Sequence, residues 1–187
     1  MRSSWSRSVE HFFITGLPRS RTLWLANYFS FGWSLCHHEL TFEAIDRDME
    51  FDGGEFRLRM LDNPCRYIGN SDSGMLPFWR EIGDLFPHAP WLVVTRPENE
   101  VRASLAAAGI DQAGVAEMSR HLDDLMFSLQ PLVVRFSDID REIEQLERYL
   151  TPDAYYPDSR RRMLLRANAT VTDRRVAEIK EHFTCRG

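Results

Sequence analysis

The sequence has no uninterrupted run of about 18 apolar residues, the minimum for a helix that crosses a bilayer. The first ten residues carry two arginines, but no apolar stretch behind them would make a secretory signal peptide. Lysine is almost absent, because all but one of the 23 basic residues are arginine, and the formal net charge is -5. The net charge argues against a nucleic-acid partner, and the missing apolar run argues against a membrane partner. Arginine instead suits the recognition of a small oxyanion in a local pocket.

Cysteine is also scarce, with Cys36, Cys65 and Cys185 in no paired spacing. An odd and sparse set of cysteines predicts free thiols in a reducing compartment, and therefore a cytoplasmic protein. No Cys-x-x-Cys pair is present, and the adjacent His37 and His38 would point to opposite faces of a strand, where they chelate a metal poorly. We therefore expect no metal centre.

The length and composition fit one globular domain over residues 1–187, since 43% of the residues are hydrophobic and 27% are charged. Short apolar runs that predict strands alternate with patterns that predict helices. The predicted strands are 11–15, 33–36, 65–69, 91–95 and 132–136, and the predicted helices are 20–31, 76–86, 97–108, 112–129, 138–150 (capped by Asp138) and 172–183. Such an alternation is typical of a three-layer α/β/α fold around a central, mainly parallel sheet of four to five strands, in which ligands bind where the strands end.

The turn after the first predicted strand reads Gly16-Leu-Pro-Arg-Ser-Arg-Thr-Leu-Trp24 and leads into a helix. Backbone N–H groups at such a turn converge on the positive end of the helix dipole and make an anion site. Arg19, Ser20 and Thr22 could add side-chain donors. The turn is not a Walker A loop, which would need glycine and lysine where Arg21 and Thr22 stand. The alternative is an ordinary strand–helix turn capped by Ser20.

A second feature combines a charged residue at the end of a strand with a hydroxyl two helical turns later. Arg96 directly follows the apolar run Trp91–Thr95, and Ser104 lies eight residues further on. An arginine at the mouth of a parallel strand needs a partner, because an unpaired buried charge is costly, and a bound phosphate would be one. The alternative is a salt bridge from Arg96 to Glu98 or Glu100.

Together these two features resemble the sulfotransferases that use 3′-phosphoadenosine 5′-phosphosulfate (PAPS). The segment Pro18-Arg-Ser-Arg-Thr-Leu-Trp24 is similar to their 5′-phosphosulfate loop, and Arg96-Pro97 with Ser104 is similar to their 3′-phosphate motif. Leu132-Val-Val-Arg-Phe-Ser-Asp-Ile139 is similar to a later segment of the family, and the three occur in the family's order. The resemblance implies a fold like that of the P-loop nucleoside triphosphate hydrolases and a donor site formed by Gly16, Pro18, Arg19, Ser20, Arg21, Thr22, Leu23, Arg96 and Ser104.

The resemblance also implies a mechanism. A sulfuryl group would move in line from PAPS to a hydroxyl or amine of a small-molecule or glycan acceptor, and no metal would be required. Arg19 would neutralise the charge that develops on the leaving phosphate oxygen, while Thr22 and backbone amides would hold the 5′-phosphate. Glu39, in Cys36-His-His-Glu39 after the second strand, takes the place of the family's general base, with His38 and then His37 as alternatives. Otherwise Glu39 is a carboxylate favoured by a helix N-terminus.

The main departure from the family is Arg21, which stands where glycine is usual. Its side chain points outward, reaches the donor, or closes the loop. Two other classes of function therefore stay open. One is a small-molecule P-loop kinase that uses ATP–Mg²⁺, with Asp72 or Asp138 as the metal-holding carboxylate, and the other is a non-catalytic nucleotide-binding protein of the same fold.

The acceptor itself has no readable code, because acceptor pockets are built from variable loops. Ser71 and Asp72 either touch the acceptor or belong to a turn, and Phe42, Phe51 and Trp79 line either its pocket or the core. The basic cluster 160–162 matches the family's late basic loop in position, or is a solvated helix face. The sequence predicts neither the acceptor nor the oligomeric state.

Overall fold

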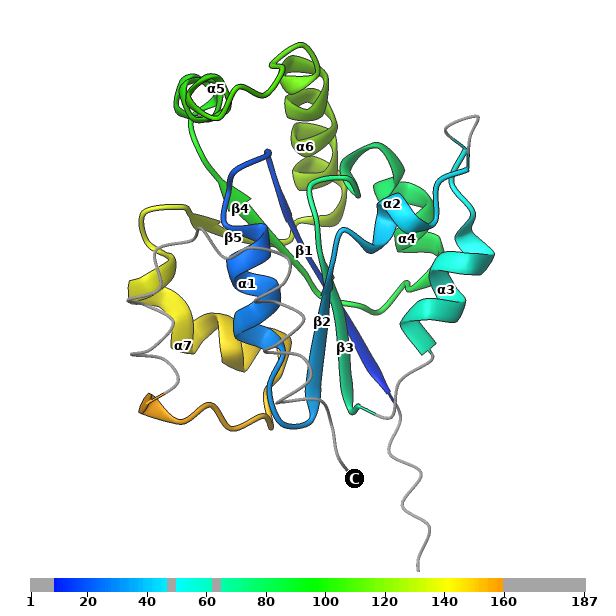
Figure 1. The fold of residues 1–187 in the computed structure, drawn as a ribbon. Helices are drawn as coiled ribbons and strands as arrows, with labels where there is room; N and C mark the ends of the chain where they lie inside the picture. The colour runs from blue at the N-terminus through cyan, green and yellow to red at the C-terminus, as the bar shows by residue number, and fades with distance from the viewer. Residues whose placement is uncertain (1–8, 47–49, 62–64, 160–187) are drawn as a thin grey trace, which may run out of the picture.

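Five strands form one all-parallel sheet in the order β2-β3-β1-β4-β5 (Figure 1). The computed structural model describes residues 9–46, 50–61 and 65–159. The strands are β1 (Glu10–Gly16), β2 (Ser34–His38), β3 (Tyr67–Ser71), β4 (Trp91–Thr95) and β5 (Leu132–Arg135). The predicted parallel sheet is therefore confirmed. The predicted helix 172–183, the basic cluster 160–162 and Cys185 lie outside the described residues.

Helices cover both faces of the sheet and give a three-layer α/β/α arrangement (Figure 1). One face carries α1 (Thr22–Phe29) and α7 (Ile139–Leu150). The other carries α3 (Gly53–Leu61), η1 (Leu76–Phe78), α4 (Trp79–Leu85) and α6 (Val115–Leu129), while α2 (Leu40–Glu43) and α5 (Glu98–Ala107) lie near the ends of the strands. The sequence did not predict α2 or α3. The first is only four residues long, and the second buries only Phe56 and Met60, which is too little for a helical period to stand out.

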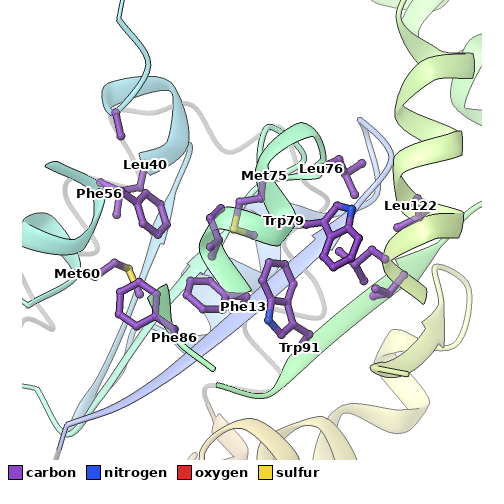
Figure 2. Close-up of a cluster of buried hydrophobic side chains, with 14 of the residues drawn as sticks. Phe13, Leu40, Phe56, Met60, Met75, Leu76, Trp79, Phe86, Trp91 and Leu122 are labelled. Atoms are coloured by element: carbon purple, nitrogen blue, oxygen red, sulfur yellow. The ribbon is translucent and has the colours of Figure 1, made fainter. Parts of the chain in front are cut away.

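The strands pack by alternation, because successive side chains point to opposite faces of a sheet. In β1, Phe12 and Ile14 join the core under α1 and α7, whereas Phe13 joins the core on the other face. There its ring centroid lies 4.8 Å from that of Trp91 and 5.4 Å from that of Phe86 (Figure 2). Apolar burial on both faces fixes the register of the central strand, and with it the place where the chain leaves the sheet.

The cysteines differ from the prediction of free thiols. Cys36 is a buried thiol outside any disulfide, as expected, but Cys65 is disulfide-bonded, so the prediction is wrong for that residue. Because the expected reducing compartment rested on unpaired cysteines, these residues do not support it. Over the described part of the chain, no helix combines the length and the hydropathy that a membrane span requires.

Neither the cap predicted at Asp138 nor the alternative cap at Ser20 is present. Asp138 stands at the N-cap position of α7, but its side chain makes no capping hydrogen bond and lies 3.4 Å from the guanidinium of Arg141 instead. Ser20 does not cap α1, because the N-cap position belongs to Arg21. In both cases the backbone at the helix start differs from the extended conformation that lets a side chain turn back onto the first N–H groups.

Candidate functional site

The loop that joins β1 to α1 (residues 17–21, here the β1–α1 loop) has an unusual backbone. Arg19 and Arg21 adopt left-handed conformations, with φ angles of 67° and 63°. Two left-handed residues within three positions curve the backbone, and such curvature directs successive N–H groups into one concavity that suits an anion. The Ser20 hydroxyl is fully buried in this loop and has no hydrogen-bond partner among the described residues. The loop is therefore not a plain capped turn, and it holds a buried hydroxyl that is available to a bound anion.

The second predicted motif meets this loop directly. Strand β4 pairs with β1, so Arg96 emerges beside the β1–α1 loop and donates from Nη1 to the carbonyl oxygen of Arg19 at 2.8 Å. The Nε of Arg19 in turn donates to the Ser104 hydroxyl at 3.3 Å. Residues that are 77 to 85 positions apart in the chain thus form one cluster of two guanidinium groups and a hydroxyl. This is the convergence expected if both motifs hold one anionic ligand.

The alternative partner predicted for Arg96 is also present, although the geometry is weak. Arg96 Nε lies 3.4 Å from Glu100 Oε2, at the outer limit of a hydrogen bond, while Glu98 pairs with Arg102 instead. The guanidinium also lies 4.2 Å from the ring centroid of Phe136, which supports it by a cation–π contact. Arg96 is thus held in place at the end of β4 without losing all its donors to a carboxylate.

Arg21 neither fills the β1–α1 loop nor points freely outward. Its Nη1 forms an ion pair with Asp140 Oδ1 at 2.9 Å, at the start of α7. Its guanidinium also lies 4.9 Å from the ring centroid of Phe136, so this ring packs against both Arg21 and Arg96. A left-handed conformation costs a residue with a side chain more than it costs glycine. Here the ion pair and the ring contact offset the conformational cost of a side chain.

The conformation of Arg21 leads to a stability prediction. Arg21→Ala and Arg21→Gly both remove the ion pair with Asp140, but only glycine relieves the left-handed strain. We therefore expect Arg21→Gly to be more stable than Arg21→Ala by about 1 kcal/mol, measured by urea denaturation. Asp140→Asn, which keeps the strain and removes only the partially exposed ion pair, should cost about 0.5 kcal/mol. Equal stability of the alanine and glycine variants would contradict a left-handed residue 21.

The predicted general base follows β2 at the same edge of the sheet. Glu39 is left-handed, with a φ of 60°, and its side chain is 58% exposed. It stands at the N-cap of α2 without a capping hydrogen bond from its side chain, so the alternative, a carboxylate favoured by a helix N-terminus, also fits its position. His38 is largely buried, and its Nδ1 lies 3.8 Å from Glu39 Oε1. Glu39 is therefore more accessible than His38, the first of its two alternatives.

A buried polar cluster at the end of β3 separates Glu39 from the β1–α1 loop. The Ser71 hydroxyl donates to the carbonyl oxygen of Thr22 at 2.8 Å, and the Thr15 hydroxyl donates to that of Asp72 at 2.8 Å. Ser71 and Asp72 are no more than 1% exposed, so neither is placed to touch an acceptor. Burial raises the pKa of the Asp72 carboxyl, although the N–H of Gly74 and donors on Thr41 and Asn70 oppose this rise.

The aromatic residues proposed for the acceptor pocket divide between core and surface. Trp79 is buried in the core, and the partly buried Phe51 packs against the same core. Phe42 of α2 remains 58% exposed, three residues after Glu39, and is the most exposed of the three. Two cavities of about 410 and 450 Å³ lie at the opposite edge of the sheet, where both are lined by Phe86, Pro90 and Tyr149. They take no part in the cluster at the strand ends.

Several residues that make contacts within the candidate site were not predicted, because these contacts join residues far apart in the sequence. They are Thr15, Thr41, Asn70, Phe136 and Asp140. A usable signal existed for the polar ones, since each of Thr15, Asn70 and Thr41 lies at or just after the end of a strand. No protein-family model and no curated protein sequence matches the chain, so its function must be inferred from the site itself.

Proposed function

We propose that the protein is a sulfotransferase with a P-loop nucleoside triphosphate hydrolase-like fold, which transfers a sulfuryl group from PAPS to a hydroxyl or amine of a small molecule or glycan. The observation that carries the proposal is the contact of Arg19 with both Arg96 and Ser104. A β1–α1 loop on the central strand of an all-parallel sheet, at the carboxyl edge, is also where such folds bind phosphates.

The described residues fit a donor that carries anions at two positions. The backbone amides of the β1–α1 loop, Thr22 and the unpartnered hydroxyl of Ser20 would hold a 5′-phosphosulfate. Arg96 and Ser104 would hold a 3′-phosphate, and Arg19 lies between the two groups. Arginine suits both tasks, because its planar guanidinium binds phosphate oxygens through two parallel N–H groups.

The chain's own residues supply the remaining chemistry. PAPS, when bound, supplies the activated sulfuryl group. Glu39 accepts the proton of the acceptor hydroxyl as the new sulfur–oxygen bond forms, and Arg19 neutralises the phosphate oxygen that leaves sulfur. Glu39 follows β2, two strands away from β1, which corresponds to about 10 Å between the strand ends. That separation leaves room for the transferred group and the attacking oxygen between base and loop.

The observations favour this function over a kinase. A P-loop kinase holds Mg²⁺ with a hydroxyl after the loop lysine and a carboxylate at a strand end. Here the position of the lysine is Thr22, and the Asp72 carboxylate is buried and accepts from the N–H of Gly74. Asp138 is engaged with Arg141. A non-catalytic nucleotide-binding protein would share the same donor site, and only turnover separates it from an enzyme.

The deciding experiment compares 3′-phosphoadenosine 5′-phosphate, ADP and ATP–Mg²⁺ as ligands in a thermal-shift assay. We expect selective stabilisation by the 3′-phosphorylated nucleotide, of about 2.7 kcal/mol at 100 times its dissociation constant. Arg96→Ala should weaken this binding at least about tenfold, since it removes a charged phosphate ligand. Arg102→Ala is the matched control, because Arg102 lies on α5 but pairs with Glu98. A response to ATP–Mg²⁺ alone, or to none of the three, would contradict the proposal.

A further inference from the structure

Two adjoining cavities lie at the amino ends of β1 and β4, at the edge of the sheet opposite to the donor site. They share Phe86, Pro87, Ala89, Pro90 and Tyr149, and the larger cavity has a volume of about 450 Å³. That volume is within the range of about 300–1,000 Å³ found for small-molecule sites. Strand β1 has seven residues and runs from this cavity to the β1–α1 loop, so about 20 Å separate the cavity from the donor site. The cavity is therefore distinct from the donor site.

The walls of the larger cavity are mostly apolar. They include Phe86, whose ring centroid lies 5.4 Å from that of Phe13 in the core (Figure 2). Val9, Leu61 and Tyr149 also line the cavity and are 38%, 48% and 39% exposed. Exposed apolar side chains that gather around one hollow indicate a binding site for an apolar group. Three prolines in the lining fix the backbone around it, so binding requires little further ordering of these walls.

One guanidinium without a carboxylate partner belongs to this apolar lining. Arg57 of α3 is exposed and forms no ion pair with a carboxylate in the part of the chain that the structure describes, whereas Arg59 on the same helix forms two. Glu10 also lines the cavity, but it pairs with Arg66 at 3.4 Å. Arg57 is thus the charge in the cavity that a ligand can balance.

His11 lines the same cavity and does not add a second positive charge. Its ring centroid lies 4.7 Å from that of Phe86, and its Nε2 is buried without a hydrogen-bond partner among the described residues. Burial lowers the pKa of the His11 imidazole, and the positive charge of Arg57 lowers it further. The imidazole is therefore neutral near pH 7, and an anion in the cavity would be attracted by Arg57 alone.

We propose that this cavity binds a small monocarboxylate with an apolar body, such as an aryl-substituted acid, whose carboxylate pairs with Arg57 while its body contacts the apolar walls. One guanidinium matches one carboxylate through two parallel N–H groups. A phosphate dianion fits less well, because Glu10 belongs to the same lining and the other basic side chains there are only His11 and His88. The inference concerns a second ligand and does not depend on the proposed transfer reaction.

Phenylacetate is a suitable probe, and backbone amide chemical shifts report where it binds. We expect saturable binding with a dissociation constant of about 1 mM or lower, and shift changes centred on residues 9–11, 57–61, 85–90 and 149–152. Acetate lacks the apolar body and benzyl alcohol lacks the charge, so each should bind at least about tenfold more weakly. No binding of phenylacetate, or equally tight binding of benzyl alcohol, would overturn the inference.

Three variants decide whether Arg57 holds the carboxylate. Arg57→Gln should weaken the binding of phenylacetate at least about tenfold, since it removes the charged partner. Arg59→Gln is the matched control on the same helix, and Arg96→Ala is the control for the donor site. Both should keep the affinity within about twofold. Loss of binding in Arg96→Ala rather than in Arg57→Gln would place phenylacetate at the donor site and overturn the inference.

Titration of the His11 imidazole by NMR gives a readout that a change in stability would not move. Saturating phenylacetate should raise the pKa of His11, because the bound carboxylate offsets the charge of Arg57. In Arg57→Gln the ligand should no longer shift this pKa. If phenylacetate left the His11 pKa of the wild type unchanged, its carboxylate would not lie beside Arg57 and the inference would be wrong. None of these measurements involves sulfuryl transfer, so failure of this site and failure of the proposed function are distinguishable.

Discussion

Replacing Arg19 by alanine is expected to lower kcat for sulfuryl transfer by about 10²- to 10³-fold, which is the usual cost of removing one donor that stabilises developing charge. Arg19 belongs to the β1–α1 loop and contacts both residues proposed for the 3′-phosphate, Ser104 through its Nε and Arg96 through its own carbonyl oxygen. Alanine retains a Cβ, so the left-handed strain at this position is unchanged and the fold should keep its stability. Steady-state kinetics with saturating PAPS measure the effect.

Ser104→Ala provides the matched comparison for Arg19. It removes a hydroxyl that contacts Arg19 at the proposed 3′-phosphate position, remote from the transferred group. We expect it to raise KM for PAPS by up to about tenfold with kcat nearly unchanged, because ground and transition states lose the same contact. If both variants changed KM alone, Arg19 would be a binding residue and the charge neutralisation assigned to it would be wrong.

The sheet and the meeting of the two candidate motifs were predictable because their signals are local. Strand Trp91–Thr95 is a continuous apolar run, which only a strand buried on both faces tolerates, and the structure places it next to the central strand. Once parallel strands are predicted, their carboxyl ends share one edge, so Arg96 had to lie near the β1–α1 loop. The observed contact of Arg96 with Arg19 follows from that topology.

The remaining features depend on contacts that carry no local signal. The departure at Arg21 had three possible outcomes from the sequence, and the structure selects a fourth, an ion pair with Asp140, which lies 119 positions away. The end of β3, with Ser71 and Asp72, read equally well as a turn or as acceptor contacts. Its burial against α2 emerges only when Thr41, itself on a helix too short to be predicted, packs onto it.

Gly16→Ala is expected to destabilise the protein by about 3 kcal/mol or more, at the upper end of what overpacking costs. Gly16 is the last residue of β1 and pairs with Val94 of β4. A Cβ at this position would lie 2.4 Å from the Val94 carbonyl oxygen and 3.3 Å from the Ser20 Cβ. A backbone oxygen within a paired strand has no rotamer to escape into, so β1 and β4 would have to separate.

Gly83→Ala is the control for this substitution, since the same methyl group is added inside α4, where no heavy atom lies within 4 Å of the new Cβ. Alanine there should stabilise the protein by about 0.5–1 kcal/mol, because it restricts the unfolded chain and favours helix. The midpoint of urea denaturation should therefore shift in opposite directions for the two variants.

If Gly16→Ala folds, the β1–α1 loop must move away from Arg96. Binding of 3′-phosphoadenosine 5′-phosphate should then weaken together with the loss of stability. A Gly16→Ala protein as stable as the wild type would mean that β1 and β4 do not approach at this register, and the contact of Arg19 with Arg96 would lose its structural basis.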